Sequence, residues 1–389
     1  MSVTFARGFS AAGLSAGISS VPGKSDMALV VNDGPLDVAA GVFTSNRFSA
    51  APVQWSREVV KGGHAKGMVI NSGCANACTG AEGLAQSRKT AEAFAQAAGT
   101  TADKVLVGST GLIGELLPLD HVLSGIEKGF PQLAPSEEAG VAASQAILTT
   151  DTQPKRVCLQ VDGYRLGGMV KGSGMIAPQL ATMICVLTTD AVVSAKQADA
   201  ALRKATSTSF DRIDVDGCMS TNDTVVLLAS GASGITPDME EFTATVSSAC
   251  SQLARKIVGD GEGSSHDIKV SVTDASSEEA ALACARAVAA SNLFKCAVAG
   301  NDPNWGRIVS SFGTVPEQIA PYDPAKVTVD INGIRVCDGG APGQPRELVD
   351  MTPREVHVDI ALHSGSESAT IWTDDLTHEY VHINSEYES

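Results

Sequence analysis

The stretch KGSGMIAPQLATMICVLTTDA, residues 171–191, constrains the fold of this chain most strongly. It opens with a glycine-rich segment that contains proline, which predicts an irregular turn. An apolar run then starts at Thr182 and ends before Asp190, a pattern typical of a buried strand. Thr182 therefore stands where a loop becomes a strand. A Thr hydroxyl is an effective nucleophile only beside a base, and one such base is its own amine if the chain is cut before it.

Short apolar runs alternate with helical segments through the first two thirds of the chain, which favours an α/β (α+β) fold of more than one domain. Helices are expected after Thr79 with Glu82 as a capping box, around 138–147, after Ser194 with Gln197, from Thr236-Pro237 to Gly259, and after Ser276 with Glu279. Strands are expected at 27–31, 38–43, 68–71, 105–107, 157–161, 182–189, 224–229 and 268–272.

The last hundred residues have a different pattern. Two apolar runs, 327–331 and 334–336, flank Asn332-Gly333, which is the signature of a hairpin with a type I′ turn. Apolar residues alternate with polar ones over 356–362, and a further strand is expected at 369–372. We expect a smaller C-terminal α+β domain that begins between residues 275 and 320, and place its start at 281.

Composition excludes several classes of protein. The net charge is −16 and no Lys/Arg cluster stands out, so we expect no nucleic-acid partner. No apolar run reaches the length of a membrane span and no signal-peptide pattern opens the chain, which predicts a cytosolic protein. The nine Cys form an odd, scattered set, so disulfides are not expected. Cys74 and Cys78 lack a second pair at zinc-ligand spacing, and we predict no metal.

Three polar loops are candidates for chemistry. The strand that ends at Val107 is expected to run into a turn, Gly108-Ser109-Thr110-Gly111, whose backbone N–H groups could bind an anion or oxyanion. A Thr-rich loop, TTDT, occupies 149–152. An acidic turn flanked by glycine, DGEG, occupies 260–263. Each could contribute to one site in the folded chain.

Six sequence blocks together carry a family resemblance. They are GSTGLIGE from Gly108, TTDT from Thr149, KGSGMIAPQLATM from Lys171, DVDGCMSTNDT from Asp214, GNDPNWGR from Gly300 and the terminal YVHINSEYES. The blocks follow one order and span nearly the whole chain, and they resemble the ornithine acetyltransferase (ArgJ) family.

The resemblance implies a layered sheet-and-helix sandwich and a chain that cuts itself between Ala181 and Thr182. The pieces 1–181 and 182–389 would stay associated as an α2β2 assembly. Residues 182–280 would complete the catalytic region that 1–181 begins.

The implied reaction moves acetyl from N-acetylornithine to glutamate through an acetyl-threonine, releasing ornithine and N-acetylglutamate, with no cofactor. Some family members also use acetyl-CoA, and the sequence leaves this open.

The implied chemistry agrees with the residue types. An amide acetyl group is a poor electrophile, so its transfer needs an activated nucleophile and a stabilised oxyanion. A freed α-amino group on Thr182, with an ordinary pKa of about 7.7–8.0, could act as base toward its own hydroxyl. By resemblance, Thr110 and Gly111 form the oxyanion hole. The substrate-binding set is Thr149, Lys171, Thr182, Glu262, Asn384 and Ser389, with Lys171 suited to a carboxylate and Glu262 to the ornithine ammonium.

Simpler interpretations stand beside these. A Thr that opens a strand is commonly a β-former, Lys171 alone would be a solvated loop lysine, and Glu262 alone a surface acid. The block GNDPNWGR either lines the site with Asn301, Asp302, Asn304 and Arg307 or is a structural turn. One polar cluster could be mistaken for a metal site, although such residues more commonly form hydrogen-bonded turns. It consists of Asp214, Asp216, Asn222 and Asp223.

Two rival functions remain at this point. One is a self-cleaving amidase or aminopeptidase, in which water replaces glutamate as acceptor. The other is a binding protein that is never cut. The chain also departs from the usual family pattern at Cys74 and at Ser265-His266, which leaves the mechanism intact but affects expectations for contacts near Glu262.

Overall fold

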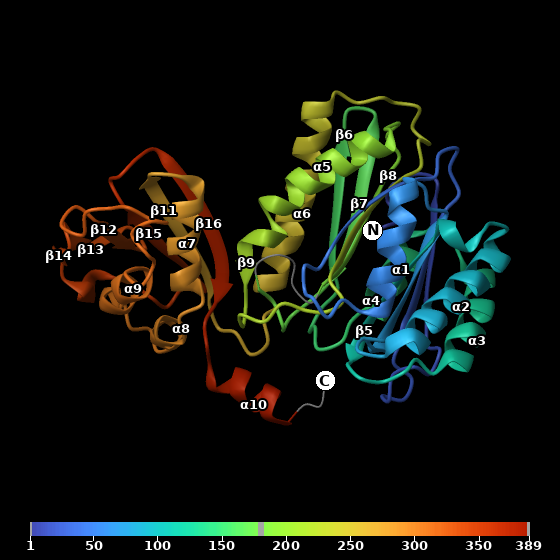
Figure 1. Cartoon of the computed structure of the whole chain (residues 1–389), viewed down its shortest axis with the longest axis horizontal. Coiled ribbons are helices and arrows are strands. Elements are labelled where there is room, and N and C mark those ends of the chain that lie inside the picture. Colours follow the sequence, from blue (N-terminus) through green and yellow to red (C-terminus); the bar gives the residue numbers. More distant parts are fainter. Residues whose placement is uncertain (1, 178–182, 387–389) are drawn as a thin grey trace. The chain divides into compact units, whose positions relative to one another are not determined.

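The computed structural model describes residues 2–177 and 183–386 (Figure 1). The chain forms two compact units. The first runs to Asp211 and also contains Cys218–Ile257, and the second contains Arg212–Gly217 and, of the described residues, 258–386. The expected boundary at residue 281 therefore falls inside the second unit, because strand β11 (Asp267–Ala275) pairs on both sides within that unit's sheet.

The first unit contains two sheets. One has the order β1-β2-β4-β5, formed by Phe9–Leu14, Met27–Asn32, Gly67–Cys74 and Val105–Leu112, and only β4 and β5 are parallel. The other has the order β3-β10-β8-β7-β6, formed by Val38–Phe43, Thr224–Ala229, Ile184–Thr189, Tyr164–Lys171 and Lys155–Val161, and only β10 and β8 are parallel.

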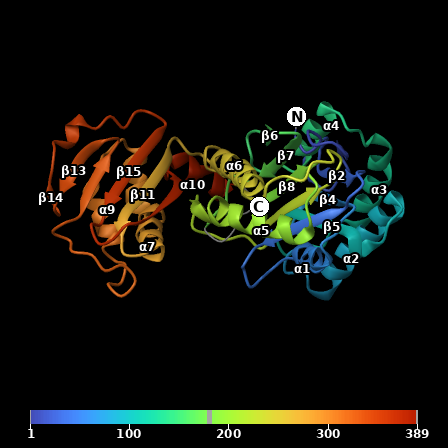
Figure 2. The same ribbon diagram turned by 90° about the horizontal axis from the view of Figure 1, so that it is seen from above.

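These sheets pack face to face between helices. Apolar residues of both sheets, such as Met68 and Leu106 from one and Ile184 and Val226 from the other, form one buried cluster. The outer faces are covered by helices on either side, so the layers run helix, sheet, sheet, helix (Figure 2). The expected layered sandwich is thus confirmed. The helices of this unit are α1 (Ala51–Val59), α2 (Gly80–Ala98), α3 (Leu119–Gly129), α4 (Glu137–Ala146), α5 (Ala195–Ser207) and α6 (Met239–Val258).

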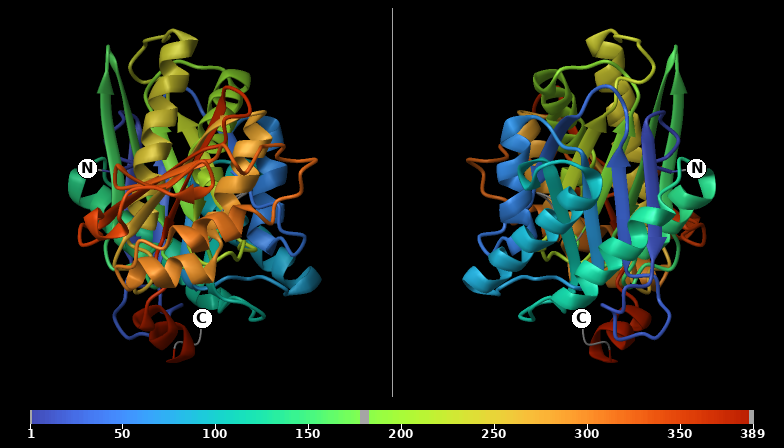
Figure 3. Two further views of the ribbon diagram at one scale, coloured as in Figure 1. Left: turned by 90° about the vertical axis from the view of Figure 1, so that its left-hand side faces the viewer. Right: turned by 90° about the vertical axis from the view of Figure 1, so that its right-hand side faces the viewer.

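Helices α2 and α3 lie across the outer face of the four-stranded sheet, as the right-hand view of Figure 3 shows. Their buried side chains, including Phe94, Val122 and Ile126, join residues of that sheet in a second cluster. On the opposite outer face, Phe242 of α6 packs against Tyr164 of β7 with ring centroids 6.1 Å apart. Both faces of β8 and β10 are therefore buried, which explains their continuous apolar sequences.

The second unit has one seven-stranded sheet of order β14-β13-β12-β15-β11-β16-β9. The expected hairpin is confirmed, with Asn332 and Gly333 at φ 46° and 81° between β12 (Thr328–Ile331) and β13 (Ile334–Asp338). Helix α7 packs on the sheet through residues such as Ala281 and Ala285. The other elements are β9 (Ile213–Asp214), β14 (Ala341–Pro342), β15 (Glu355–Ala361), β16 (Glu367–Asp374), α7 (Glu278–Ala289), α8 (Asn292–Ala299), α9 (Trp305–Phe312) and α10 (His378–Glu386).

Two expected helix starts were wrong, and the expected capping box at Thr79 is absent although the helix does start there. Ser277, not Ser276, caps α7 by accepting from the amide of Ala280. Helix α6 begins at Met239, and Asp238 accepts from the amides of Glu240 and Glu241, so the helix starts after Thr236-Pro237. Thr79 precedes α2 but makes no side-chain cap, because its hydroxyl donates to Asn76 instead. The capping box at Ser194 and Gln197 is confirmed.

No single helix of the described residues is long and apolar enough to cross a membrane. The bent pair α7 and α8 meets the criterion only by joint length and composition, and the apolar side chains of α7 belong to the core of the second unit.

Candidate active site

The oxyanion residues expected from the sequence lie at the end of a strand, not in a turn. Strand β5 continues through Thr110 and Gly111 to Leu112, because parallel pairing with β4 keeps this segment extended. Thr110 is buried, at 3% exposure. Gly111 has φ +130°, and a Cβ added there would lie 2.3 Å from the carbonyl carbon of Gly73. Only glycine fits at this position.

A buried lysine connects the two sheets at Thr110. Lys171 ends β7 and is 2% exposed, and its Nζ donates to Thr110 Oγ1 at 3.4 Å. Since the ammonium occupies an acceptor position of this oxygen, the hydroxyl hydrogen of Thr110 remains free to point elsewhere. The fold thus brings together Thr110 and Lys171, two residues that the resemblance assigns to the site. Lys171 is not a solvated loop lysine.

Asp151 anchors the Thr-rich loop beside Lys171. Its Oδ1 accepts from Lys155 Nζ and from the Gly172 amide, both at 2.6 Å. Burial raises the pKa of this carboxyl, but Lys171 and Lys155 more than offset that effect, and the pKa lies below its usual value. Asp151 Oδ2 accepts from the amide of Thr149 at 3.3 Å. Thr149 is thereby tied to the segment that follows Lys171.

Met183, the second residue after the expected cleavage site, is held by the carboxyl group of Asp223. The amide of Met183 donates to Asp223 Oδ1 at 3.1 Å, and the Met183 carbonyl accepts from the amide of Thr224. Ala181 and Thr182 lie outside the described residues, and so does Ser389. The expected strand from 182 to 189 is described from Ile184 onward.

Asn222 joins the start of β10 to the strand that carries Thr110. Its Nδ2 donates to the carbonyl oxygens of Ala75 at 2.7 Å and Ser109 at 2.8 Å. Asn222 and Asp223 therefore make hydrogen bonds near the site, which agrees with their interpretation as bonded turn residues. Sequence reasoning missed the anchoring roles of Asp151 and Asp223, although both stand inside the blocks that carry the family resemblance.

Two further expected site residues meet in the second unit. Asn384, on α10, donates from Nδ2 to Glu262 Oε2 at 2.9 Å. The Tyr380 hydroxyl of the same helix donates to Asp216 Oδ2 at 3.4 Å. Burial and the neighbouring Asp216 and Glu262 raise the pKa of Tyr380, so this phenol stays protonated. The acidic turn and the last helix thus form one polar cluster.

The GNDPNWGR block serves local structure. Asn304 caps α9 by accepting from the amide of Arg307 and donates to Asp302 at 2.8 Å. Arg307 donates to the carbonyl of Leu293 at 2.6 Å. These contacts favour the structural interpretation of the block.

The described residues contain no group of three or more His, Cys, Asp or Glu that could hold a metal ion. The candidate acidic set is divided, because Asp214 and Asp216 belong to the second unit and Asn222 and Asp223 to the first. The nine cysteines, all within the described residues, form no disulfide with one another.

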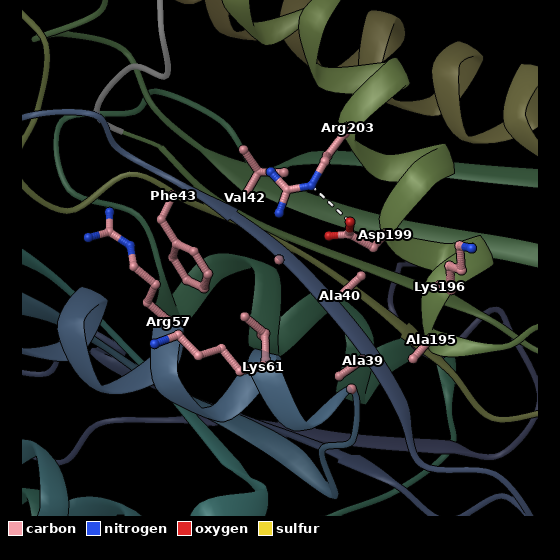
Figure 4. A pocket seen from close by; sticks show the side chains of 13 residues that line it. Ala39, Ala40, Val42, Phe43, Arg57, Lys61, Ala195, Lys196, Asp199 and Arg203 are labelled. Atoms are coloured by element: carbon pink, nitrogen blue, oxygen red, sulfur yellow. Dashed lines mark hydrogen bonds and ion pairs between the residues drawn. The ribbon is translucent and has the colours of Figure 1, made fainter.

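A separate pocket of about 520 Å³ lies along the edge strand β3, between α1 and α5 (Figure 4). Arg57, Lys61, Lys196 and Arg203 line it, and Arg203 is paired with Asp199 at 2.9 Å. None of the expected site residues contributes to this pocket. It is therefore distinct from the Thr110 and Lys171 site.

Comparison with known proteins gives consistent matches. The ArgJ family model matches residues 10–389. An arginine biosynthesis bifunctional protein ArgJ from Bifidobacterium longum is 68% identical over 391 residues, covering 100% of both chains. The protein of the same name from Streptomyces avermitilis is 53% identical over 389 residues, again covering 100% of both. A solved chain of ornithine acetyltransferase complexed with ornithine, from Mycobacterium tuberculosis, is 44% identical, with a TM-score of 0.45, and the match covers 47% of this chain and 96% of that one.

Proposed function

The chain belongs to the ArgJ family and is an acetyltransferase of arginine biosynthesis, and we propose that Thr182 is its nucleophile after cleavage of the Ala181–Thr182 bond. In this proposal the acetyl group moves from N-acetylornithine to Thr182, ornithine leaves, and glutamate collects the acetyl group. The contact between Lys171 and Thr110 carries the proposal, because it sets a buried hydroxyl donor beside a cation at the end of β5.

The first half-reaction uses the freed α-amine of Thr182 as base. The amine takes the proton of the Thr182 hydroxyl, whose oxygen attacks the acetyl carbonyl of the substrate. The developing oxyanion accepts hydrogen bonds from the Thr110 hydroxyl and the Gly111 amide, each such donor being worth roughly 10²–10³ in rate. The carbon–nitrogen bond then breaks, and the α-ammonium returns its proton to the departing ornithine amine.

The second half-reaction is the reverse with a different amine. The amine of glutamate attacks the acetyl-threonine, and N-acetylglutamate leaves. A site used by both amino acids needs charges of both signs. Lys171 supplies a buried cation for an α-carboxylate. By the family resemblance, Glu262, which accepts from Asn384 Nδ2 at 2.9 Å, is the proposed partner of the ornithine side-chain ammonium.

The relatives' name, bifunctional protein, supports a second activity in which acetyl-CoA is the acetyl donor and glutamate the acceptor. Acetyl-threonine would be the shared intermediate. Initial rates with acetyl-CoA and glutamate measure this activity directly. No N-acetylglutamate above background would restrict the enzyme to N-acetylornithine as donor.

The main test is the intact mass of the purified protein. Two fragments are expected, 1–181 and 182–389, and they would associate as an α2β2 assembly. The Thr182→Ala variant should remain one uncut chain without transferase activity. Thr208→Ala is the matched control, because this exposed hydroxyl donates only to carbonyls of α5. A single uncut wild-type chain with full activity would contradict the proposal.

Product analysis separates the transferase from a hydrolase. With N-acetylornithine and glutamate together, N-acetylglutamate should form in step with ornithine. Predominant release of free acetate would instead favour a self-cleaving amidase.

A further inference from the structure

Strand β3 lies at the edge of the five-stranded sheet, and part of that edge is open. The amide of Thr44, just after β3, donates to the residue that precedes β10, whereas the amide of Ala39 donates to Gly63 on the other side. Successive residues of an antiparallel strand direct their backbone groups alternately to the two sides. The backbone groups of Gly41 and Phe43 therefore point away from the sheet, as those of Ala39 do.

A short stretch, residues 63–65, already pairs in antiparallel fashion with the start of β3. This pairing ends at Gly63, whose φ of +72° links it to the 3-10 helix Val60–Gly62 instead of to a longer strand. Among the described residues, no group bonds the backbone N–H or C=O of Gly41 or Phe43. Gly41 is nonetheless buried, and buried backbone groups are nearly always paired. These groups are therefore available to an extended chain from another molecule.

The pocket of about 520 Å³ lies along this open edge (Figure 4). Strand β3 lines it from Ala39 to Phe43. Three of these residues, 39–41, have a methyl group or no side chain, which leaves space beside the strand. The volume is in the usual range of sites for organic ligands. The open edge of β3 thus borders a space that can hold a short stretch of extended chain.

The charge of this pocket is opposite in sign to that of the molecule. Arg57 and Lys61 line it from α1 and the turn after it, and Lys196 and Arg203 line it from α5. Asp199 is the one acidic side chain among the described residues that line the pocket, so its formal charge is 4 − 1 = +3. The whole chain carries −16. A cationic pocket on such a surface attracts anionic ligands.

Several of these cations can take a new carboxylate partner. Arg57 lies over the ring of Phe43, 5.8 Å from its centroid. Among the described residues, neither Arg57 nor Lys196 forms an ion pair with a carboxylate. Lys61 is paired with Glu58 at 2.7 Å, but both side chains are exposed, and exposed pairs of this kind are weak. The pocket therefore offers cations as well as backbone groups.

We propose that the edge of β3 binds an extended acidic segment of a partner protein, which adds to the sheet as a strand beside Gly41 and Phe43. Main-chain hydrogen bonds to these two residues supply affinity. Successive side chains of a strand point to opposite faces. Carboxylates at neighbouring positions therefore reach the cations of α1 and its turn on one face and those of α5 on the other. This surface is separate from the acetyl-transfer site, and the inference does not rest on cleavage at Ala181–Thr182.

A fluorescent hexaglutamate peptide, acetylated and amidated at its ends, is the probe for the purified full-length protein. Fluorescence anisotropy should show saturable binding, with a dissociation constant that rises with NaCl because salt screens exposed charges. The same peptide methylated on every backbone nitrogen keeps its charges but has no N–H to donate to β3. It should bind at least about tenfold more weakly. Equal affinity of the two peptides would overturn strand addition.

Matched substitutions locate the binding site. Arg57→Gln combined with Lys196→Gln should weaken peptide binding by at least about tenfold, because two charge-assisted contacts are lost. Lys204→Gln is the control, since Lys204 is an exposed lysine of the same helix, α5, that does not line the pocket. It should bind the peptide as the wild type does, and transferase activity should be unchanged in all these proteins. Equal weakening by the control would overturn the proposal.

Self-association is the competing use of an open sheet edge. Size exclusion of the peptide-free protein should give the same oligomeric state for the wild type and for the Arg57→Gln, Lys196→Gln double variant. A change of oligomeric state in the double variant would mean that this edge joins copies of the chain, and would overturn binding of a partner segment.

Discussion

Gly111 occupies a backbone conformation that other residues rarely adopt, and it lies against the last two residues of β4. An added Cβ would lie 2.3 Å from Gly73 C and 2.6 Å from Cys74 N, both backbone atoms. Gly111→Ala should therefore destabilise the protein by more than the ~1–2 kcal/mol of left-handed strain alone, and should lower transferase activity. Gly114→Ala is the control, since Gly114 has φ +89° but open space around it. Equal unfolding free energies in urea for the two variants would contradict this expectation.

Lys171 and Lys155 both act on the Asp151 carboxylate, yet only Lys171 contacts Thr110. Replacing either with Met leaves a buried carboxylate short of one cation, and a stability loss of about 3–5 kcal/mol is expected for each. Only Lys171→Met should also lower kcat/KM for N-acetylornithine, by at least about 10². Steady-state rates at a temperature where both variants are folded make the comparison. Equal losses of activity in Lys171→Met and Lys155→Met would contradict a specific role for Lys171 in acetyl transfer.

Asp151 also makes the free energy of unfolding depend on pH. Its pKa is lower in the folded chain than when unfolded, so its contribution is present above the unfolded pKa and is lost as pH falls through the folded pKa. Lys155→Met raises the folded pKa toward the unfolded one. The variant's stability deficit should therefore be largest at neutral pH and shrink below about pH 4. Urea titrations from pH 3 to pH 7 test this, and a constant deficit would contradict it.

At the residue level the sequence offers candidates for the chemistry, whereas it does not show which residues hold these candidates in place. Thr110, Gly111 and Lys171 are candidates because they stand in blocks with a family resemblance. The contacts of Asp151 with Lys171 and Gly172, and that of Asp223 with Met183, could not be predicted, because these partners come from segments distant in the chain. Local spacing carries no information on such contacts.

At the level of elements, the start of α7 offers a direct comparison of two adjacent serines. Ser277 accepts from the Ala280 amide, whereas the exposed Ser276 makes no capping bond. Ser277→Ala should cost about 1 kcal/mol of stability, within a range of 0.5–2. Ser276→Ala should cost only a few tenths, as is usual for surface substitutions. Thermal unfolding of the two variants decides which serine is the cap.

Strands that were predicted and strands that were missed differ in composition. The apolar runs of β3 and β10 matched their observed bounds, because β-branched and aliphatic residues dominate them. Strand β1 was missed because its sequence, FSAAGL, contains no β-branched residue and its four central residues are small. Its Gly13 lies against the backbone of α4, where an added Cβ would be 2.1 Å from the carbonyl oxygen of Ala142. The close packing of α4 on β1 therefore requires a small residue here, and small residues do not give the β-branched, apolar pattern by which strands are predicted.

At the scale of the whole molecule, the five-stranded sheet is built from both expected pieces of the chain. Strands β3, β7 and β6 precede residue 181, whereas β8 and β10 follow it. The order β3-β10-β8-β7-β6 therefore contains two ladders that join one piece to the other, β3 with β10 and β7 with β8. Each ladder pairs six residues of each strand, and both lie in the buried core. A cut at Ala181–Thr182 leaves these contacts intact.

Cleaved protein should therefore behave as one particle whose stability depends on its concentration. Both fragments are expected in one peak on native size exclusion at micromolar concentration, and they should separate only in denaturant. The melting temperature of the cut protein should rise with protein concentration, because unfolding releases two chains, whereas that of uncut Thr182→Ala should not rise for this reason. Any assembly of whole molecules would affect both proteins alike, so the difference between them isolates the effect of the cut. Fragments that part on dilution without unfolding would mean that the two ladders and their core do not hold the cut sheet together.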